Sequence, residues 1–303
     1  MTGRFAPSPS GRMHLGNAFS ALLAWLSVRS QKGTMLLRIE DLDPARSKEE
    51  YVRLLRDDLH WLGLDWDVES SPQSQRTSRY EAAFHKLEKK ELLYPCYCTR
   101  AELHSASAPH GSDGQLRYPG TCRSLPASQR PDTRPAWRIK TTREEIAFCD
   151  GLQGEYASRI FEDCGDFVVR RADGVYAYQL AVVVDDGEMG VTQVVRGMDL
   201  LSSTPRQLYL YEALGLTPPA FYHVPLLTAP DGRRLSKRDG DIDFAYLRER
   251  FRPQQVVGLL AYTAGLLPRP IPCTPTELAG DFSWQRVTRD KTCNIYAGLQ
   301  LLE

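Results

Sequence analysis

Residues 4–17 read RFAPSPSGRMHLGN. This segment predicts a short strand, Gly3 to Ala6, which ends where two prolines force an extended turn, because proline lacks an amide hydrogen and restricts the residue before it. A helix is then expected to begin near Gly16 and to continue through Val28. Such a junction points unpaired backbone N–H groups and the positive end of the helix dipole at one place, and that place attracts phosphate.

His14 lies just before the expected helix, where it could donate a further hydrogen bond to a phosphoryl oxygen. An ordinary strand–turn–helix junction with a chance histidine would have the same local sequence. The rest of the chain therefore has to decide between a phosphate site and a purely structural turn.

The composition limits the class of protein. A chain of 303 residues can bury a full core as one large domain or two smaller ones. Its 38 basic residues balance its 38 acidic residues, so any contact with nucleic acid has to come from a local face. The sequence has no apolar run as long as a membrane span and no signal-peptide hydrophobic region. Seven cysteines, an odd number, do not indicate a disulfide framework, so we expect a cytoplasmic protein without a membrane partner.

Alternating strands and helices indicate a nucleotide-binding α/β fold in the first part of the chain. We predict a strand over Thr34–Asp41 and amphipathic helices over Ser47–Gly63 and Thr77–Glu91. The strand ends in Glu40 and Asp41, and polar residues at that end of a parallel strand lie where open α/β sheets bind ligands. Strand-end carboxylates also often cap the next helix, so a structural role stays open.

Two cysteines one residue apart, Cys96 and Cys98, precede a loop that leads to Cys122. Three thiolates leave a tetrahedral zinc ion one ligand short, and the fourth could be water or a side chain of the loop: Tyr118, His104 or His110. Three ordinary thiols would give the same spacing, so both interpretations stay open.

The remaining part of the fold is expected to be a β-rich insertion at 132–156, followed by a second α/β segment. A hairpin is predicted around the Asp-Gly turn at Asp173 and Gly174. The predicted elements are strands over Pro135–Lys140, Gly165–Arg171, Val175–Leu180, Val191–Gly197 and Tyr222–Leu227, and helices over Ala181–Asp186 and Thr204–Leu214.

A basic loop from Asp231 to Gly240 follows the last predicted strand, and it contains two glycines, four cations and a serine. This composition is suited to closing on a polyphosphate: Lys237 would neutralise phosphate charge and Ser236 would donate a hydrogen bond. A solvated basic loop is the commoner outcome for such a sequence. Residues 241–303 are expected to be mainly helical, with arginines that could contact an RNA stem: Arg248, Arg250 and Arg252.

Two of these motifs, in order along the chain, resemble the two signature motifs of the class I aminoacyl-tRNA synthetases: His14-Leu15-Gly16-Asn17 and Arg234-Leu235-Ser236-Lys237-Arg238. The wider segment Arg4–Asn17 and three further motifs are similar to the glutamate- and glutamine-specific branch of that family: Arg38–Asp43, Tyr178–Asp186 and Val195–Leu200. Several motifs in the same order over most of the chain make coincidence very improbable.

Within that branch the chain is most similar to the glutamyl-Q tRNA(Asp) synthetases. Related glutamyl-tRNA synthetases continue into a large anticodon-binding domain, for which the sequence leaves no room after the second signature motif. In the glutamyl-Q tRNA(Asp) synthetases, glutamate is activated with ATP and attached to the queuosine base in the anticodon of tRNA(Asp). The resemblance therefore implies ATP with Mg²⁺, L-glutamate and the tRNA(Asp) anticodon stem-loop as partners of a monomeric ligase.

The fold that this resemblance implies is an α/β fold, a Rossmann-type class I synthetase catalytic domain with a zinc-containing insertion and a small C-terminal helical subdomain. The two halves of the catalytic domain would be 1–92 and 161–240, separated by an insertion at 93–160, and the helical subdomain would be 241–303. The family's zinc site corresponds to four residues of this sequence that would hold one structural Zn²⁺: Cys96, Cys98, Tyr118 and Cys122.

The resemblance also implies the site residues. His14 and Lys237 would be catalytic. The glutamate pocket would comprise Arg4, Phe5, Ala6, Pro7, Ser8, Glu40, Tyr178 and Arg196, and ATP would contact His14, Gly16, Asn17, Arg234, Ser236 and Lys237. For Glu40 and Arg196, a plain ion pair at the sheet edge is the structural alternative.

Two positions depart from the family pattern. Asn17 stands where the first signature usually ends in a second histidine, and Arg234 stands where the second usually begins with lysine. Both keep a hydrogen-bond donor, although guanidinium and ammonium differ in geometry, so we expect altered detail rather than lost activity.

Two other functions have to be weighed. One is a glutamyl-tRNA synthetase without an anticodon domain that still charges a tRNA 3′ end, and the other is a non-catalytic paralogue that binds a nucleotide or RNA. The presence of His14 and Lys237 argues against the second, because an inactive relative need not keep its phosphate contacts.

Overall fold

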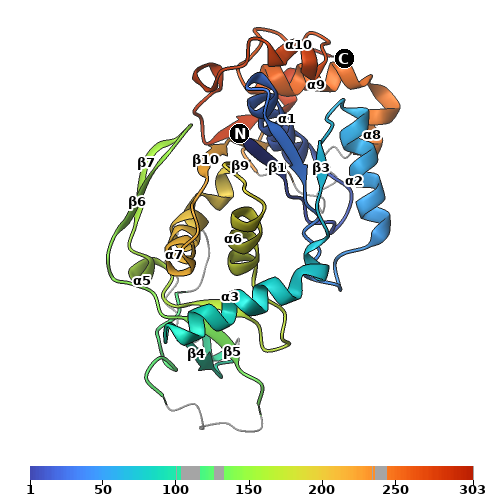
Figure 1. The fold of residues 1–303 in the computed structure, drawn as a ribbon. Helices are drawn as coiled ribbons and strands as arrows, with labels where there is room; N and C mark the ends of the chain where they lie inside the picture. The colour runs from blue at the N-terminus through green and yellow to red at the C-terminus, as the bar shows by residue number, and fades with distance from the viewer. Residues whose placement is uncertain (100, 104–116, 126–132, 234, 236–243, 303) are drawn as a thin grey trace.

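The computed structural model describes residues 1–99, 101–103, 117–125, 133–233, 235 and 244–302 (Figure 1). Six of the residues discussed above lie outside this described part: His104, His110, Arg234, Ser236, Lys237 and Arg238. None of the helices in the described part combines the length and the apolar character that crossing a membrane requires.

A parallel sheet forms the beginning of the chain. Strand β1 pairs with β2, and β2 pairs with β3. Helix α1 is buried on several sides, because it lies against β1 and β9 (Gln193–Gly197) as well as against helices from the C-terminal part. The elements are β1 (Thr2–Phe5), α1 (Leu15–Ser30), β2 (Thr34–Leu37), α2 (Glu49–Trp61) and β3 (Val68–Glu69).

The strand predicted over Thr34–Asp41 ends as a strand at Leu37. The chain nevertheless stays beside β1, since the amide of Arg38 donates to the carbonyl of Phe5 at 2.8 Å and the amide of Glu40 to that of Pro7 at 3.0 Å. Pro7 has no N–H to donate in return, which ends the regular ladder. Residues 38–40 therefore lie beside the segment that leads into α1.

A second parallel pair, β9 and β10, forms a separate two-stranded sheet that lies beside β1. The amide of Thr192, just before β9, donates to the carbonyl of Thr2 at 2.9 Å. Side by side, the two sheets place their strands in the order β3-β2-β1 and then β9-β10, so the chain order reverses between β1 and β9. Open α/β sheets bind ligands beyond the carboxyl ends of their strands at such a point. The elements here are α6 (Tyr178–Glu188), β9 (Gln193–Gly197), η2 (Met198–Ser203), α7 (Thr204–Leu214) and β10 (Ala220–Val224).

The predicted hairpin around Asp173 and Gly174 is only partly formed. Its first arm is β8 (Phe167–Arg170), but the second arm contributes one isolated bridge, between Arg170 and Tyr176. Helix α6 already begins at Tyr178, so the prediction of a strand over Val175–Leu180 is wrong.

The strand predicted over Tyr222–Leu227 is two strands. Pro225 interrupts it because proline cannot donate to a ladder, and the chain passes from β10 into β11 (Leu226–Thr228). Strand β11 pairs in parallel with β12 (Thr292–Asn294), which lies in the region predicted to be helical.

Residues 93–170, which comprise the predicted insertion and the strand β8 that follows it, form two antiparallel sheets. One is formed by β4, β5 and β8, and the other is the hairpin β6–β7, which runs up the side of the molecule to β10 (Figure 1). The strand predicted over Pro135–Lys140 corresponds to β5. The elements are η1 (Gln73–Arg76), α3 (Thr77–Lys89), β4 (Leu93–Cys96), β5 (Ala136–Ile139), β6 (Ile146–Asp150), β7 (Gly154–Ser158) and α5 (Ile160–Asp163).

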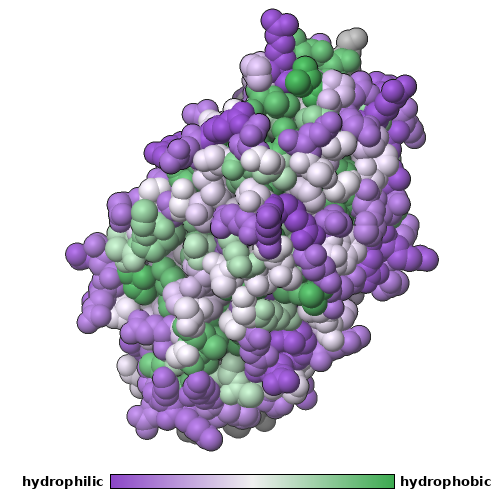
Figure 2. Space-filling view, turned by 45° about the horizontal axis from the view of Figure 1, so that its top comes forward, coloured by the Kyte–Doolittle hydropathy of each residue, from purple (hydrophilic) through white to green (hydrophobic). Residues whose placement is uncertain are grey.

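Two apolar cores hold these layers together. The first includes buried residues of β1, α1, β2 and α2 with those of the C-terminal helices, and the second includes α3, β5, α6 and α7. The face drawn in Figure 2 mixes hydrophilic residues with small, separate hydrophobic groups. The C-terminal elements are α8 (Phe244–Arg250), α9 (Pro253–Thr263), α10 (Pro275–Ala279), η4 (Trp284–Arg286) and α11 (Tyr296–Leu299).

Candidate functional site

A cavity of about 220 Å³ lies at the ends of β1 and β9 and the beginning of α1. Its wall includes nine of the site residues predicted from the sequence: Arg4, Phe5, Ala6, Pro7, His14, Gly16, Asn17, Tyr178 and Arg196. It also includes residues that the sequence analysis did not select, among them Met13, Ser20, Asp199 and Leu200. Ser8 and Glu40 are not part of this wall.

The beginning of α1 presents His14 to the cavity. His14 is in extended conformation immediately before the helix, and its amide lies 3.5 Å from Oδ1 of Asn17. A Cβ at Gly16 would lie 3.0 Å from the His14 imidazole, so glycine leaves room for that ring. The contact with the His14 amide shows that the side chain of Asn17 is turned back towards the beginning of the helix.

Leu235 is the described residue of the second signature motif, and it lines the same cavity as His14 and Gly16. Its amide is bonded to the carbonyl of Leu227 in β11 at 3.3 Å. The two motifs, more than two hundred positions apart in the sequence, thus reach one cavity.

A buried carboxylate also links the two regions. Asp58 on α2 accepts hydrogen bonds from Arg12 at 3.0 Å and from Arg248 at 2.9 Å. Arg12 belongs to the turn before α1, whereas Arg248 lies on α8, which follows the second motif. The side chain of Arg248 also pairs with Asp57, and Arg250 donates to Tyr246, so two of the arginines considered for RNA have protein partners.

A buried charge cluster lies beside the cavity, with Arg38 at its centre. Arg38 is within 2.6 Å of Asp186, 3.0 Å of Glu40 and 3.7 Å of Asp185. Burial alone would lower the pKa of Arg38, but the attraction of the three carboxylates raises it above its ordinary value. Arg38 therefore stays charged and holds all three carboxylates together.

Glu40, predicted for the glutamate pocket, is bonded to Arg38 inside this cluster. Burial raises the pKa of Glu40, and this effect outweighs the attraction of Arg38 and Arg4. Ser8, the other residue outside the cavity wall, is exposed on the turn. Glu40 thus forms an ion pair with Arg38, which was the structural alternative to a role in the glutamate pocket.

Helix α6 supplies the acidic side of the cluster. Asp186 lies 3.6 Å from Nε of Arg4, and Asp185 accepts from Arg76 at 2.6 Å and from Tyr80 at 2.9 Å. The sequence analysis did not select Asp185 or Asp186 as site residues. Two adjacent carboxylates after the apolar run Val182–Val184 were the signal that could have identified them, because buried charges require partners.

Arg196 is on the cavity wall and almost fully buried. Its guanidinium donates to Gln207 and Thr204 at 2.8 Å and to His223 at 2.9 Å. Burial lowers its pKa below the ordinary arginine value. Tyr178, at the first turn of α6, faces the same space, and burial raises the pKa of its hydroxyl.

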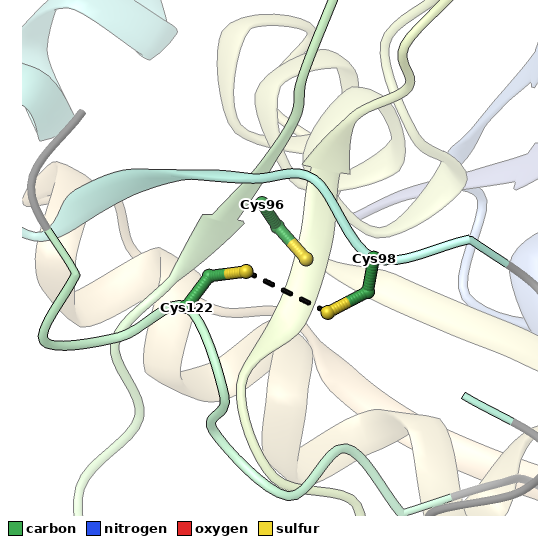
Figure 3. Close-up of side chains that lie close together, drawn as sticks. All are labelled: Cys96, Cys98 and Cys122. Carbon is green, nitrogen blue, oxygen red and sulfur yellow. Dashed lines mark hydrogen bonds between the residues drawn. The ribbon is translucent and has the colours of Figure 1, made fainter. Parts of the chain in front are cut away.

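The three cysteines predicted to bind metal come together at the end of β4 (Figure 3). The sulfur atoms of Cys96, Cys98 and Cys122 lie within 4.8 Å of one another, and those of Cys98 and Cys122 are 3.5 Å apart. The hydroxyl of Tyr118 is 3.4 Å from the Cys96 sulfur and 3.9 Å from that of Cys98. Three thiols within reach of one ion are a donor set that fits zinc, and the hydroxyl of Tyr118 lies beside them.

Arg138 on β5 supports this cluster from one side. Its Nε donates to the sulfur of Cys96 at 3.2 Å, and its guanidinium lies 3.7 Å from the centre of the Tyr118 ring. Burial alone would raise the pKa of the Cys96 thiol, but the contacts with Tyr118 and Arg138 hold it below its ordinary value. A thiolate, the form that binds metal, is thereby favoured at Cys96.

Comparison with known proteins identifies the family. The family model for class I tRNA synthetases (E and Q), catalytic domain, matches residues 1–260. A glutamyl-Q tRNA(Asp) synthetase of Symbiobacterium thermophilum is 50% identical over 96% of this chain and 94% of its own length. One of Nitratidesulfovibrio vulgaris is 48% identical over 92% of this chain and 90% of its own.

The fold agrees with that assignment. The crystal structure of a glutamate tRNA ligase from Elizabethkingia meningosepticum in complex with its amino acid superposes with a TM-score of 0.83 at 27% identity. The match covers 97% of this chain and 67% of that one. The chain therefore belongs to the class I tRNA synthetases of the glutamate and glutamine group, and within them to the glutamyl-Q tRNA(Asp) synthetases.

Proposed function

We propose that the protein activates L-glutamate with ATP to form glutamyl-adenylate and then transfers glutamate to the queuosine base in the anticodon of tRNA(Asp). The observation that carries this proposal is the similarity to glutamyl-Q tRNA(Asp) synthetases at 48–50% identity over nearly the whole of both chains. In the first step, a carboxylate oxygen of glutamate attacks the α-phosphorus of ATP in line and pyrophosphate leaves. In the second, the bond to AMP breaks as the queuosine acceptor takes the glutamyl group.

Glutamate would bind at the β1–β9 end of the cavity. Arg4 and Arg196 are cations on its wall, and arginine pairs with carboxylates through a bidentate fork. Tyr178 would hydrogen-bond the substrate from α6. Glu40 would not contact the ammonium of glutamate directly, because its carboxylate is bonded to Arg38. It would instead influence the ammonium electrostatically, as one carboxylate of the buried charge cluster. The pocket would otherwise consist of the backbone and side chains of residues 4–7, with Ser8 following just outside its wall.

ATP would occupy the part of the cavity between the two signature motifs. His14 and the amides at the beginning of α1 would hold the phosphates, with Gly16 and Asn17 beside them. Lys237, Ser236 and Arg234 would close on the triphosphate from the second motif, and Mg²⁺ would accompany ATP. Phosphoryl transfer requires mainly positioning and charge stabilisation from these groups.

The cysteine cluster would hold a structural zinc ion through Cys96, Cys98, Cys122 and Tyr118. Bound there, zinc would cross-link the end of β4 to the loop that contains Tyr118, and so stabilise the insertion. We further propose that the protein is monomeric and cytoplasmic and that it binds the anticodon stem-loop of tRNA(Asp). Its catalytic domain would comprise 1–92 and 161–240, with the insertion at 93–160 and the helical subdomain at 241–303.

Glutamate transfer is expected to depend on queuosine. With radiolabelled glutamate, ATP and the purified protein, tRNA(Asp) that contains queuosine should become labelled, whereas the same tRNA lacking queuosine should stay unlabelled. Equal labelling of the two tRNAs would favour charging of the 3′ end, and absence of glutamate-dependent ATP–pyrophosphate exchange would favour a non-catalytic protein. Periodate is not a suitable control, because it destroys the diol of queuosine as well as that of the terminal ribose.

Replacing Cys98 by serine is expected to remove most of the bound zinc from the purified protein and to lower its unfolding temperature, because a structural zinc ion requires its full ligand set. Elemental analysis and thermal unfolding measure the two effects. Cys149→Ser is the matched control, since Cys149 is an exposed free cysteine outside the cluster. Unchanged zinc content in Cys98→Ser, or no zinc in the unaltered protein, would contradict this assignment.

A further inference from the structure

A buried chain of three side chains ends at the wall of the cavity. Oδ2 of Asp150 lies 2.6 Å from Nδ1 of His223, and Nε2 of His223 lies 2.9 Å from Nε of Arg196. The three residues are at most 5% exposed, so these contacts are shielded from bulk water. Buried polar groups depend strongly on the partners that remain to them.

The direction of each hydrogen bond follows from the chemistry of the groups. A guanidinium can only donate, so Nε2 of His223 accepts from Arg196 and Nδ1 carries the proton donated to Asp150. Burial lowers the pKa of His223 despite the neighbouring carboxylate, in agreement with a neutral ring. Asp150 is fixed in turn by three backbone amides, those of Leu152, Gln153 and His223 itself, at 2.9–3.2 Å.

These three hydrogen-bonded side chains come from two distant parts of the sequence. His223 and Arg196 are directly opposite each other in the β9–β10 ladder, whereas Asp150 ends strand β6 of the inserted hairpin (Figure 1). The hairpin is fixed to β10 by a 2.8 Å hydrogen bond from the amide of Gly151 to Phe221. A Cβ at Gly151 would lie 2.1 Å from the Tyr222 ring, so glycine permits this close approach.

We propose that His223 and Asp150 are positioning residues that fix the guanidinium of Arg196 for a carboxylate of the amino-acid substrate, so that the β6–β7 hairpin contributes to glutamate recognition. This inference rests on the proposed function of Arg196. Gln207 and Thr204 hold the two terminal nitrogens of the guanidinium, and His223 holds Nε. A guanidinium fixed at all three nitrogens is ordered before substrate arrives, which lowers the entropic cost of binding.

Two substitutions at His223 separate the effects of its two hydrogen bonds, the one to Asp150 and the one to Arg196. In His223→Asn, Nδ2 can still donate to Asp150, but the shorter side chain does not reach Nε of Arg196. In His223→Gln, Oε1 is three bonds from Cβ, like Nε2 of histidine, and can accept from Arg196. We expect His223→Asn to raise the KM for glutamate about tenfold or more in ATP–pyrophosphate exchange, with the KM for ATP changed by less than about twofold. His223→Gln should recover most of the affinity for glutamate.

Thermal unfolding of each variant accompanies the kinetics, and Asp150→Asn, expected to raise the same KM by a smaller factor, provides a further variant if His223→Asn does not fold. The matched control is His85→Asn, because His85 is an exposed histidine on α3. Equal values of KM for glutamate in the unaltered protein and His223→Asn would overturn the inference. So would a parallel rise in KM for both substrates, or a glutamine variant no better than the asparagine variant. Failure of the unaltered protein to catalyse exchange would instead contradict the proposed function.

Discussion

Replacing Lys237 by alanine is expected to lower glutamate-dependent ATP–pyrophosphate exchange by about 10²–10³-fold. Lys237 belongs to the second signature motif, and Leu235 of that motif lines the same cavity as His14. Negative charge increases on the α-phosphate and on the departing pyrophosphate during the reaction. A fixed ammonium stabilises this charge more in the transition state than in the ground state, so the loss should be in kcat rather than in KM.

Steady-state exchange rates at saturating ATP and glutamate measure this effect. Lys89→Ala is the matched control, because Lys89 is an exposed lysine on α3, and it should retain full activity. Lys237→Arg should retain part of the rate, since the charge is kept but the planar guanidinium presents its donors differently. Near-normal exchange by Lys237→Ala would exclude Lys237 from the mechanism.

The position of the cavity could be anticipated because its wall is built from local motifs. Residues 4–17 contain in one segment the strand, the turn and the helix start, and the two prolines require the turn between them. The same holds for the cysteine cluster, where Cys96 and Cys98 are close in sequence. What spacing alone left open was the fourth donor, and the structure brings the hydroxyl of Tyr118 next to two of the three sulfurs.

Pairings between distant residues could not be predicted in this way. Nothing near Arg38 in the sequence indicates that its strongest partner is Asp186, on a helix 148 positions later. His223 likewise depends on Asp150, which reaches it only because the inserted hairpin packs on β10. The strand β12 was missed for a related reason, since three residues become a strand only by pairing with β11. Such features follow from tertiary packing, which overrides local propensity.

Replacing Arg38 by methionine is expected to destabilise the protein by about 3–5 kcal/mol, because removal of one partner leaves buried charges uncompensated. Arg38 is fully buried and is the shared cation of Glu40, Asp185 and Asp186. Asp185 keeps Arg76, but Glu40 and Asp186 would depend on Arg4, whose Nε is 3.6 Å from Asp186. The unfolding temperature should therefore fall by an amount on the order of 10 °C.

The pH dependence of this loss distinguishes uncompensated charge from lost packing. Without Arg38, the folded-state pKa of Glu40, which burial already raises, should rise further above its unfolded value, so the folded variant binds more protons than the unfolded chain. The stability of the variant should then decrease as pH rises from about 4 through the raised folded-state pKa of Glu40, and the deficit relative to the unaltered protein should be larger at pH 8 than at pH 5.

Urea unfolding at the two pH values measures that difference, and Arg79→Met, at an arginine whose side chain is 63% exposed, should be nearly neutral at both. Adding Asp186→Asn to Arg38→Met should restore part of the stability, because it removes one of the carboxylates left without its cation. If the stability lost in Arg38→Met does not vary with pH and is not restored by Asp186→Asn, Arg38 stabilises the fold by filling space. In that case the residues beside the cavity would not form an electrostatic unit, and the indirect action of Glu40 on the substrate ammonium would lose its physical basis.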